Sequence, residues 1–381
     1  MPLQRRRFNF PTRIEYGPGA LEDLPGLIKN TGLTKGLLVT DEGVKKTGTP
    51  QKLLSLFKNA GIHIHIFSDI KPNPTDHNCY QGAAVYKETG SEFIVALGGG
   101  SPLDTAKVIK ILATHDGPIE KYDDTKGGDQ FINNNMPPLY AIPTTAGTGS
   151  EVGRSGLVTI NQTKVIIFSP FLLPQIAVLD PMVTVSLPKA LTASTGVDAF
   201  VHALEAFMVN AFHPLADGLA KEALALCYQN LPLAVKDGGN IEARGIMLTA
   251  SAMGAIAFQK GLGLNHSIAH ALGALFDCPH GLTNAALMIP VLKYNASEKT
   301  VQEKLATLAH LFGTDKSPQS VINKLSDWLK SIDMPVNLKQ FNIPADKLGE
   351  IEAYVLSEPC LGTNPRRPKT GEICSLLTEV I

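Results

Sequence analysis

Three of the ten histidines in this 381-residue chain fall in one short stretch, NHSIAHALGALFDCPHG at residues 265–281. His266 and His270 are four residues apart, so on a helix their imidazoles lie on one face. His280 follows a turn that an Asp-Cys-Pro sequence marks. Imidazole nitrogens bind Zn(II), Fe(II) and related ions, so the stretch is a candidate metal site; the alternative is a helix with histidines on its surface.

A carboxylate lies at helical spacing from a fourth histidine, in LTASTGVDAFVHALEAF at residues 191–207. Asp198 and His202 would share one face of that helix, one turn apart. Such a pair is common by chance and gains weight only from the later histidines. Three imidazoles with one carboxylate suit Fe(II), Zn(II) or another borderline divalent ion, and this donor set does not select among them.

The spacing of His266 and His270 also invites comparison with zinc peptidases. In those enzymes a glutamate directly follows the first histidine and acts as the general base. Ser267 stands at that position here. The sequence therefore excludes the peptidase interpretation.

A glycine-rich turn joins an apolar segment to a helical one in VALGGGSPLDTAKVIKI, residues 95–111. Gly98, Gly99 and Gly100 let the backbone approach a ligand closely, and the free N–H groups that open the following helix favour an anion. The turn lacks the G-x-G-x-x-G spacing of an ordinary Rossmann fold. It indicates a phosphate site, with a plain tight turn as the alternative.

Two further features extend this prediction to a dinucleotide. Residues 144–148, Thr-Thr-Ala-Gly-Thr, form a second turn after an apolar segment and offer hydroxyl donors. Asp41 follows the apolar run LLVT, where its carboxylate could accept hydrogen bonds from a ribose and would repel a 2'-phosphate. This pattern favours NAD over NADP; the alternative is that Asp41 is a surface turn residue.

The elements that must position these residues change character along the chain. The first part alternates apolar, β-branched runs with helical patterns, which is typical of a mostly parallel α/β sheet. A further strand is expected within 139–152, and 156–168 has the pattern of a hairpin folded about Asn161-Gln162. The other expected strands are 36–40, 62–67 and 92–100, and the expected helices between them include 50–60 and 76–89.

From about Pro188 onward the apolar residues recur with helical spacing, and no strand pattern of comparable strength follows. We therefore predict an α/β N-terminal domain, residues 1–184, and an all-helical C-terminal domain, residues 185–381. The expected helices of the second domain are 190–210, 214–231, 241–260, 266–276, 299–312, 317–332 and 345–356.

Composition excludes several functions. Lys and Arg number 34 against 35 Asp and Glu, so no global field would attract nucleic acid or an anionic membrane. No uninterrupted apolar run reaches the length of a membrane span, and MPLQRRRFNF lacks the apolar core of a secretion signal, so we expect a cytoplasmic protein. Five dispersed cysteines form neither a disulfide framework nor a cysteine-based zinc knot.

Four separated motifs together resemble the iron-dependent (group III) alcohol dehydrogenases. They are GGGSPLDTAK, PTTAGTGSE, TGVDAFVHALEAF and HSIAHALGALFDCPHGLTNA, in that order. The resemblance extends from YGPGAL (16–21) to TNPR (363–366), which is essentially the whole chain. It implies an N-terminal dinucleotide-binding domain, a C-terminal helical domain that holds the metal and the substrate, and a cleft between them.

Carried over position by position, the resemblance assigns the metal ligands and one further residue. Asp198, His202, His266 and His280 correspond to the four ligands of Fe2+ or Zn2+. His270 is then not a ligand, and the resemblance places it beside the nicotinamide and the substrate, where it would relay a proton.

The resemblance also assigns cofactor contacts. The glycine turn would hold the pyrophosphate of NAD, the threonine turn the nicotinamide side, and the acidic residue the ribose. The residues so assigned are Gly99, Gly100, Ser101, Thr144, Thr145, Thr148 and Asp41, with Asn73 and Lys164 as less specific contacts whose alternatives are a turn asparagine and a solvated lysine.

One segment departs from the family pattern. After GSEV the family often continues with Thr-Arg and a bulky run, whereas this chain reads Gly-Arg-Ser-Gly at 153–156. The departure puts cofactor contacts in this strand in doubt and leaves the metal ligands untouched.

The predicted function is transfer of a hydride between NAD(H) and a small primary alcohol or diol, or the corresponding aldehyde. A divalent ion with one open position would lower the pKa of the alcohol, and the nicotinamide would take the hydride. The enzymatic alternatives are a transhydrogenase that keeps its cofactor bound and a lyase like the dehydroquinate synthases. The non-enzymatic alternative, a metal-binding or filament-forming protein, has no need of His270 or the glycine turn.

The N-terminal stretch RRFNFPTRIEYGPG is expected to be extended and to lead into a turn. Members of the resembled family often pair such strands across a two-fold axis, so a homodimer or higher homo-oligomer is expected. The alternative is an edge strand of the chain's own sheet.

Overall fold

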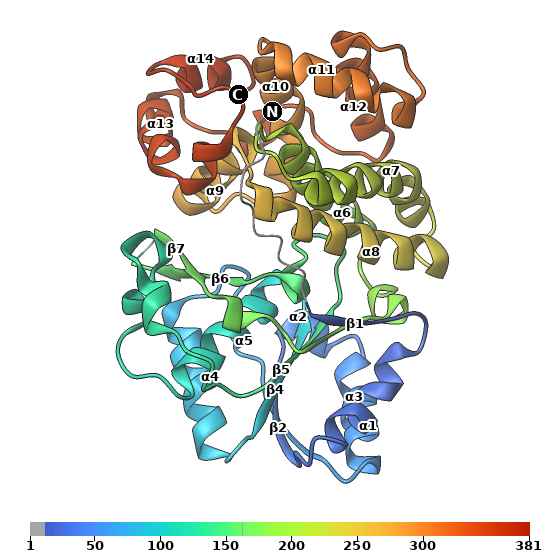
Figure 1. Ribbon diagram of the computed structural model, residues 1–381, viewed down its shortest axis with the longest axis vertical. Helices are drawn as coiled ribbons and strands as arrows, with labels where there is room; N and C mark the ends of the chain where they lie inside the picture. The colour runs from blue at the N-terminus through green and yellow to red at the C-terminus, as the bar shows by residue number, and fades with distance from the viewer. Residues whose placement is uncertain (1–11, 162) are drawn as a thin grey trace. The chain divides into compact units, whose positions relative to one another are not determined.

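The computed structural model describes residues 12–161 and 163–381 and divides them into two compact units (Figure 1). Among the described residues, the first unit comprises 12–187 with 238–248, and the second comprises 188–237 with 249–381. The predicted division lies between residues 184 and 185, and no pattern in the sequence marked residues 238–248 as part of the first unit. Arg5, Arg6, Arg7 and Gln162 lie outside the described residues.

A six-stranded sheet forms the centre of the first unit, with the strand order β1-β8-β5-β4-β2-β3. Every neighbouring pair is parallel, as the alternating pattern predicts. All residues of β4 and β5 are buried, which is expected where helices cover both faces of a parallel sheet. The strands are β1 Arg13–Tyr16, β2 Lys35–Val39, β3 His63–Phe67, β4 Phe93–Gly98, β5 Leu139–Pro143 and β8 Ile176–Leu179.

The two faces of this sheet contribute to separate apolar clusters. Leu38 and Phe93 pack with Leu53 of α3, whereas their neighbours Leu37 and Ile94 belong to the cluster on the other face. Successive side chains of a strand point to opposite faces, which explains the division. The helices of this unit are α1 Leu24–Lys29, α2 Glu42–Lys45, α3 Thr49–Asn59, α4 Asp76–Glu88 and α5 Gly100–Leu112.

The predicted hairpin is confirmed as β6 Ser155–Ile160 paired antiparallel with β7 Thr163–Phe168. Asn161 adopts a positive φ of 48° in its turn. The hairpin packs closely on α5, because a Cβ at Gly156 would lie 3.1 Å from the Asp104 carbonyl oxygen.

The N-terminal extended stretch, as far as it is described, is an edge strand of the chain's own sheet. Residues 13–16 form β1, in agreement with the alternative stated for this stretch. They pair with β8, a strand that the sequence did not predict. The part of the stretch before residue 12 lies outside the described residues.

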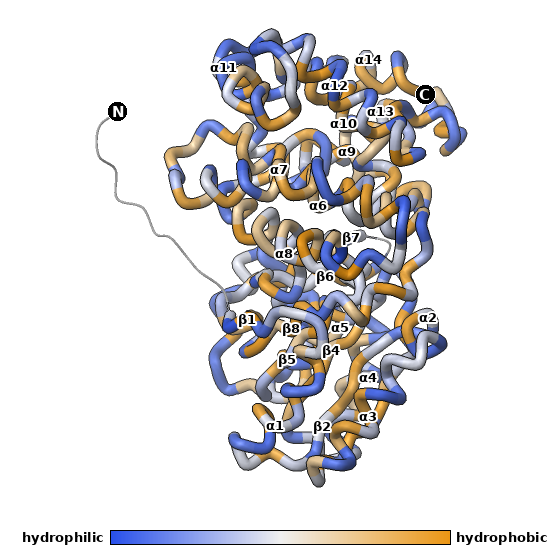
Figure 2. The backbone as a smooth tube through the Cα atoms, turned by 90° about the vertical axis from the view of Figure 1, so that its right-hand side faces the viewer, coloured by the Kyte–Doolittle hydropathy of each residue, from blue (hydrophilic) through white to orange (hydrophobic). Residues whose placement is uncertain are grey.

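The second unit is helical, and its described residues contain no strand, as predicted. Polar and apolar residues alternate along its helices, as the blue and orange segments of Figure 2 show. Helix α8, Ile241–Ala257, begins in the first unit and continues into the second. The other helices are α6 Lys189–Met208, α7 Pro214–Lys236, α9 Leu264–Phe276, α10 His280–Asn295, α11 Lys299–Leu308, α12 Pro318–Ser331, α13 Leu348–Ser357 and α14 Glu372–Thr378.

One helical stretch, Ile241–Lys260, has the length and hydropathy that crossing a membrane requires. Of its most apolar window, 61% is buried within the protein, as in a core helix. Length and composition alone make it weak evidence for a span.

Candidate functional site

Three helices of the second unit bring the four predicted metal ligands together. Asp198 and His202 come from α6, His266 from α9, and His280 from the first position of α10. Asp198 Oδ1 lies 3.3 Å from His280 Nε2 and 3.6 Å from His266 Nε2. The His202 ring stacks on the His266 ring with 4.5 Å between centroids.

Close packing of α10 against α6 places His280 in this cluster. A Cβ at Gly281 would lie 2.4 Å from the Ser194 carbonyl oxygen, so only glycine fits there without movement of the backbone. The same kind of approach holds α8 against α6, where a Cβ at Gly254 would lie 3.1 Å from the Ala199 carbonyl oxygen. Small residues beside the ligands therefore set the separation of the helices.

The donor atoms fit a divalent ion of the first transition row. Ligands about 2.1 Å from a tetrahedral ion lie roughly 3.4 Å from one another, and the two measured separations from Asp198 Oδ1, 3.3 and 3.6 Å, bracket that value. Donor atoms of Asp198, His202 and His266 all lie within 4.8 Å of one another. All three residues are buried, so they form a preassembled site and not a chance surface cluster.

A carboxylate outside the cluster fixes the orientation of His266. His266 Nδ1 lies 2.6 Å from Glu205 Oε2, and the backbone N–H of Asn265 donates to Glu205 Oε1 over 2.8 Å. Because a carboxylate accepts hydrogen bonds, the proton of a neutral His266 belongs on Nδ1. The lone pair is then on Nε2, the nitrogen that lies near Asp198.

A second chain of hydrogen bonds fixes Asp198. The Asn265 side chain donates to Asn284 Oδ1 over 2.7 Å, and Asn284 Nδ2 donates to Asp198 Oδ1 over 2.7 Å. Asn265 and Asn284 are both at most 2% exposed. The carboxylate is thus held between α6 and α10 by amides that water does not reach.

The cluster attracts positive charge. Burial disfavours the charged form of Asp198, but the neighbouring His202 and His280 outweigh it and hold its pKa well below the ordinary value. Burial also disfavours protonated His266, yet the hydrogen bonds with Asp198 and Glu205 raise its pKa to about 9. The histidines thus favour the charged form of Asp198, and the carboxylates of Asp198 and Glu205 favour a positive charge at His266.

His270 lies beside the cluster and has a different partner. Its Nδ1 lies 2.7 Å from Glu358 Oε1, and its ring stacks on the His280 ring with 5.5 Å between centroids. Glu358 Oε2 also accepts from the backbone N–H of Cys360 over 2.9 Å. Burial opposes ionisation of Glu358, but the hydrogen bonds from His270 and Cys360 outweigh it and lower its pKa.

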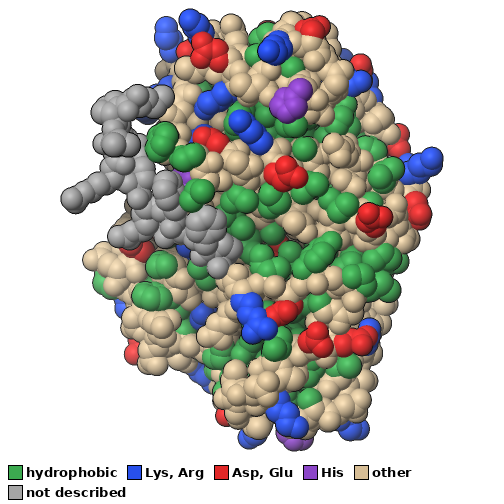
Figure 3. Space-filling view, turned by 45° about the vertical axis from the view of Figure 1, so that its right-hand side comes forward, with side chains coloured by type: hydrophobic (Ala, Val, Ile, Leu, Met, Phe, Trp, Pro, Cys, Tyr) green, Lys and Arg blue, Asp and Glu red, His purple; other side chains and the backbone are tan. Residues whose placement is uncertain are grey.

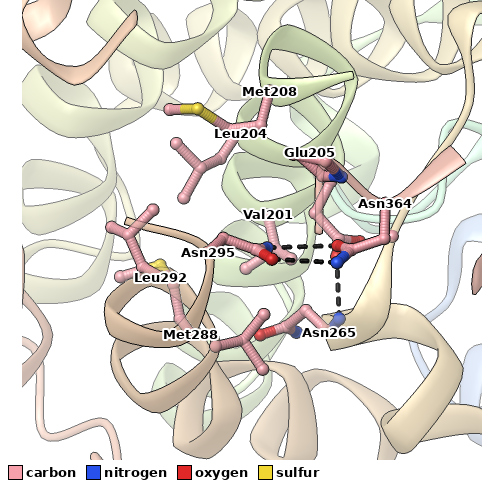
Figure 4. Close-up of a pocket in the computed structure, with 12 residues that line it drawn as sticks. Val201, Leu204, Glu205, Met208, Asn265, Met288, Leu292, Asn295 and Asn364 are labelled. Carbon is pink, nitrogen blue, oxygen red and sulfur yellow. Dashed lines mark hydrogen bonds between the residues drawn. The ribbon is translucent and has the colours of Figure 1, made fainter. Parts of the chain in front are cut away.

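A small cavity lies on the other side of Glu205 (Figure 4). Its polar lining includes Glu205, Asn265 and the mutually hydrogen-bonded pair Asn295 and Asn364. Asn265 Oδ1 is buried and has no hydrogen-bond partner in the described part of the chain, which is the setting of an ordered water. The apolar lining consists of Val201, Leu204, Met208, Met288, Val291, Leu292 and Pro365.

The predicted cofactor residues of the first unit gather at one edge of the sheet. The glycine turn follows β4 and the threonine turn follows its neighbour β5; Thr144 N donates to the Gly98 carbonyl over 2.9 Å. A Cβ at Gly100 would lie 2.8 Å from Thr148 Cγ2, so the two turns are in contact. Thr145 is also in contact with the glycine turn, since a Cβ at Gly99 would be 3.4 Å from its hydroxyl oxygen.

The start of α5 fits a phosphate. Gly99 is the N-cap residue, and no side chain caps the helix. The first-turn N–H groups, including that of Ser101, therefore have no intrahelical acceptor. They are the kind of donors that bind a pyrophosphate. The Ser101 hydroxyl itself donates to the Pro72 carbonyl, which joins this turn to the loop that contains Asn73.

Asp41 follows β2, the other neighbour of β4 in the sheet. Its Oδ1 accepts from Val44 N over 2.9 Å and caps α2. Lys164 pairs with Thr159 in the hairpin, and Thr159 N donates to the Pro74 carbonyl, so Lys164 and Asn73 lie on connected segments. The structure thus places Asp41 and the two turns after the adjacent strands β2, β4 and β5, with Asn73 and Lys164 on nearby segments that are hydrogen-bonded to one another.

The segment that departs from the family pattern is held by a buried lysine. Lys107 Nζ donates to the Ser155 carbonyl over 2.7 Å and to the Ser150 hydroxyl over 2.8 Å. Burial lowers the pKa of Lys107 to about 8, despite the opposing charges of Asp104 and Glu151. These hydrogen bonds hold the backbone of the Gly-Arg-Ser-Gly segment in place, although the segment lacks the bulky side chains that are common in the family at these positions.

Sequence reasoning missed the two glutamates and the two asparagines that orient the site. Glu205 is three residues after His202 on the same helix, and a search for partners of histidine along that face would have found it. Asn284 likewise lies one turn after a histidine on the same helix, four residues after His280 on α10. Glu358 lies 88 residues from His270, and no local pattern could have revealed it.

Comparisons with known proteins agree with this arrangement. The family model of iron-containing alcohol dehydrogenases matches residues 11–181, and that of the C-terminal part of the same family matches 192–381. The chain is 36% identical to the 4-hydroxybutyrate dehydrogenase of Cupriavidus necator, over 97% of this chain and 98% of that one. It is 36% identical to the 1,3-propanediol dehydrogenase of Klebsiella pneumoniae, over 99% and 100%.

Solved structures give the same result. The crystal structure of a 1,3-propanediol oxidoreductase matches with a TM-score of 0.93 and 34% identity, covering 99% of this chain and 100% of that one. A sulfoacetaldehyde reductase from Bifidobacterium kashiwanohense, solved in complex with NAD+, matches with a TM-score of 0.89 and 27% identity over 99% of each chain.

Glu205→Gln tests whether the carboxylate orients His266. The amide keeps the size of the side chain but removes the charge that fixes the proton on Nδ1, so we expect metal affinity to fall by about 10- to 100-fold. Affinity is measured by competition with a chromophoric chelator, on protein whose circular dichroism matches the wild type. Glu222→Gln, on the exposed face of α7, is the control and should bind metal as the wild type does. Equal affinity in the two variants would show that Glu205 does not act on the ligand.

Proposed function

Because the chain belongs to the iron-containing alcohol dehydrogenase family, and is an NAD- and metal-dependent alcohol dehydrogenase, we propose its substrates and the roles of its residues as follows. The substrates are small primary alcohols or diols, which are oxidised to aldehydes, and the same aldehydes in the reverse reaction. The observation that carries the proposal is the cluster of three imidazoles and one carboxylate, in which Asp198, His202 and His266 are buried and His280 is partly exposed.

Asp198, His202, His266 and His280 are the proposed ligands of the metal. Fe(II) is the proposed occupant, and the same donor set would accept Zn(II). Four protein ligands leave room for an alcohol oxygen. Glu205 and Asn284 hold their ligands in place before the ion arrives, so binding the ion requires little rearrangement of the protein.

When bound, the ion acidifies the alcohol hydroxyl, and NAD accepts the hydride. His270 is the proposed relay for the hydroxyl proton. Its Nδ1 donates to Glu358, which leaves Nε2 to accept a proton, and Glu358 stabilises the imidazolium that results. At 7% exposure His270 is shielded from bulk water, so a proton passes through it and not directly to solvent.

On the cofactor side, the first turn of α5 is the proposed pyrophosphate site, with Gly99, Gly100 and Ser101. Thr144, Thr145 and Thr148 are the proposed contacts on the nicotinamide side, with Asn73 and Lys164 completing the site. Asp41 is the proposed ribose contact. Its Oδ1 caps α2, and among the described residues its second oxygen remains for a ribose hydroxyl.

The names of two relatives support the proposed substrate class. Their names specify a hydroxybutyrate and a propanediol, which are short compounds with a terminal hydroxyl group. We propose that this chain also acts on a short primary alcohol, with or without a second polar group.

A homodimer is the proposed assembly, and the cytoplasm the proposed location. Strand β1 lies at the edge of the sheet, and its outer side has no partner strand among the described residues. Ile14 and Tyr16 on this strand are 39% and 56% exposed, and apolar side chains also gather on the face in Figure 3. A second copy of the chain would cover such an edge.

The first experiment restores metal to stripped protein. Chelator-treated enzyme with NAD+ and 1,3-propanediol should produce no NADH absorbance until Fe(II) or Zn(II) is added anaerobically, because the ion acidifies the alcohol. Magnesium is the control ion, since it prefers oxygen ligands and should not restore turnover. Full metal uptake without activity on any alcohol or aldehyde would favour a transhydrogenase or a lyase like the dehydroquinate synthases.

Two histidine variants separate the ligand role from the relay role. His202→Ala should lose both metal and activity. His270→Ala should keep its metal, because its imidazole is not a ligand, while turnover falls about a hundredfold. Metal content is measured by elemental analysis beside the rate. Loss of metal from His270→Ala would make it a ligand, and an active His202→Ala with stoichiometric metal would contradict the ligand assignment.

Asp41→Ser tests the ribose contact. Serine can still cap α2, but it removes the charge that repels a 2'-phosphate, so the ratio of kcat/KM for NADP to that for NAD should rise about tenfold or more. Glu42→Gln removes a charge at the next, exposed position and should leave the ratio unchanged. The assignment fails if Asp41→Ser behaves as Glu42→Gln does.

A further inference from the structure

A second group of metal-binding side chains lies beside the first. Ligand atoms of His270, Glu358 and Cys360 all lie within 4.8 Å of one another. His270 and the Glu358 side chain are buried, and Cys360 is partly exposed. None of the three belongs to the four-ligand cluster, and they supply one nitrogen, one oxygen and one sulfur.

We propose that His270, Glu358 and Cys360 form a second divalent-metal site, specific for zinc-like ions, whose occupation inhibits the enzyme. Imidazole, carboxylate and thiolate are all zinc ligands, and three protein ligands with one water complete a tetrahedron. The inhibitory part of the proposal depends on the proposed relay role of His270. The binding part does not.

The existing contacts need only small changes to bind an ion. Ligands of a tetrahedral zinc ion are roughly 3.3 to 3.7 Å apart, so the His270 Nδ1 to Glu358 Oε1 separation of 2.7 Å must widen by less than about 1 Å. The other two separations, at most 4.8 Å, must close by at most about 1.5 Å. Cys360 lies in the short 3-10 helix Pro359–Thr363 and is itself partly exposed.

Charge also favours a divalent ion here. A neutral imidazole, one carboxylate and one thiolate balance the two charges of the ion, so the buried group becomes neutral when the ion binds. The thiol proton leaves to solvent, and the proton of a neutral His270 moves from Nδ1 to Nε2. Without the ion, burial and the nearby Glu358 raise the pKa of the Cys360 thiol, so it stays protonated.

Occupation would stop the proton relay. The ion takes the nitrogen of His270 that otherwise donates to Glu358, and it takes the Glu358 oxygen that would stabilise the imidazolium. The remaining nitrogen then carries a proton and cannot accept another one. Turnover should fall about a hundredfold at saturation, as general acid–base catalysis of this kind contributes.

The thiolate gives the site a spectroscopic signature. No cysteine is among the four proposed ligands of the first site, so a sulfur-to-cadmium charge-transfer band reports on the second site. Full-length enzyme loaded with one equivalent of Zn(II) is titrated with CdCl2, and bound ions are counted by equilibrium dialysis. We expect the ultraviolet band and a second ion in the wild type, and neither in Cys360→Ser. Cys278→Ser, which removes a thiol two residues before His280, is the matched control and should keep both.

Inhibition is measured in the same proteins, as the ratio of each variant's rate with excess Zn(II) to its own rate with one equivalent. We expect this ratio to be about one hundredth in the wild type and in Cys278→Ser. In Cys360→Ser we expect the two rates to be about equal. A band that survives Cys360→Ser, or no second ion in the wild type, would overturn the site. A second ion that binds through Cys360 without inhibition would leave the site standing and contradict the relay role of His270.

Discussion

The site depends on the close approach of the start of α10 to α6. Gly281 touches the Ser194 carbonyl, where a Cβ would be 2.4 Å away, and this contact brings His280 within 3.3 Å of Asp198. A larger residue at 281 would separate the helices, and the cluster would lose one ligand while the core remained packed. The geometry of the metal site is therefore a property of helix packing, and the ligands themselves contribute little to it.

Two histidines on one face of α9 have the same kind of hydrogen-bond partner but different proposed roles. His266 and His270 each direct Nδ1 to a glutamate, Glu205 for the first and Glu358 for the second. The difference lies in what surrounds the other nitrogen. His266 Nε2 lies 3.6 Å from Asp198, whose charge favours a cation there, whereas no carboxylate holds a cation at the corresponding nitrogen of His270 among the described contacts. Nε2 of His266 is thus suited to bind an ion, and Nε2 of His270 to exchange a proton.

Features that depend on a local sequence pattern could be predicted, and features that depend on the fold could not. Apolar, β-branched runs predicted β2 to β5. The spacing of Asp198 and His202 placed these two residues on one helix face, whereas the full set of four ligands came from the family resemblance. Helix α10 was missed, since Pro279 and Pro290 interrupt its pattern; the first is its N-cap and the second lies inside it. β8 is only four residues long, and Glu358 meets His270 through the fold, so neither had a local signal.

The donor types also bear on which metal the enzyme tolerates. Three imidazoles and a carboxylate cannot prefer Fe(II) to Zn(II) by affinity, because zinc binds such nitrogen and oxygen sets more tightly. Iron in the first site must then depend on metal supply. A thiolate-containing group next to it, at Cys360, would respond to zinc far more than to iron, since soft ligands favour zinc. Excess zinc would therefore act twice, by replacing iron in the first site and by engaging His270 in the second.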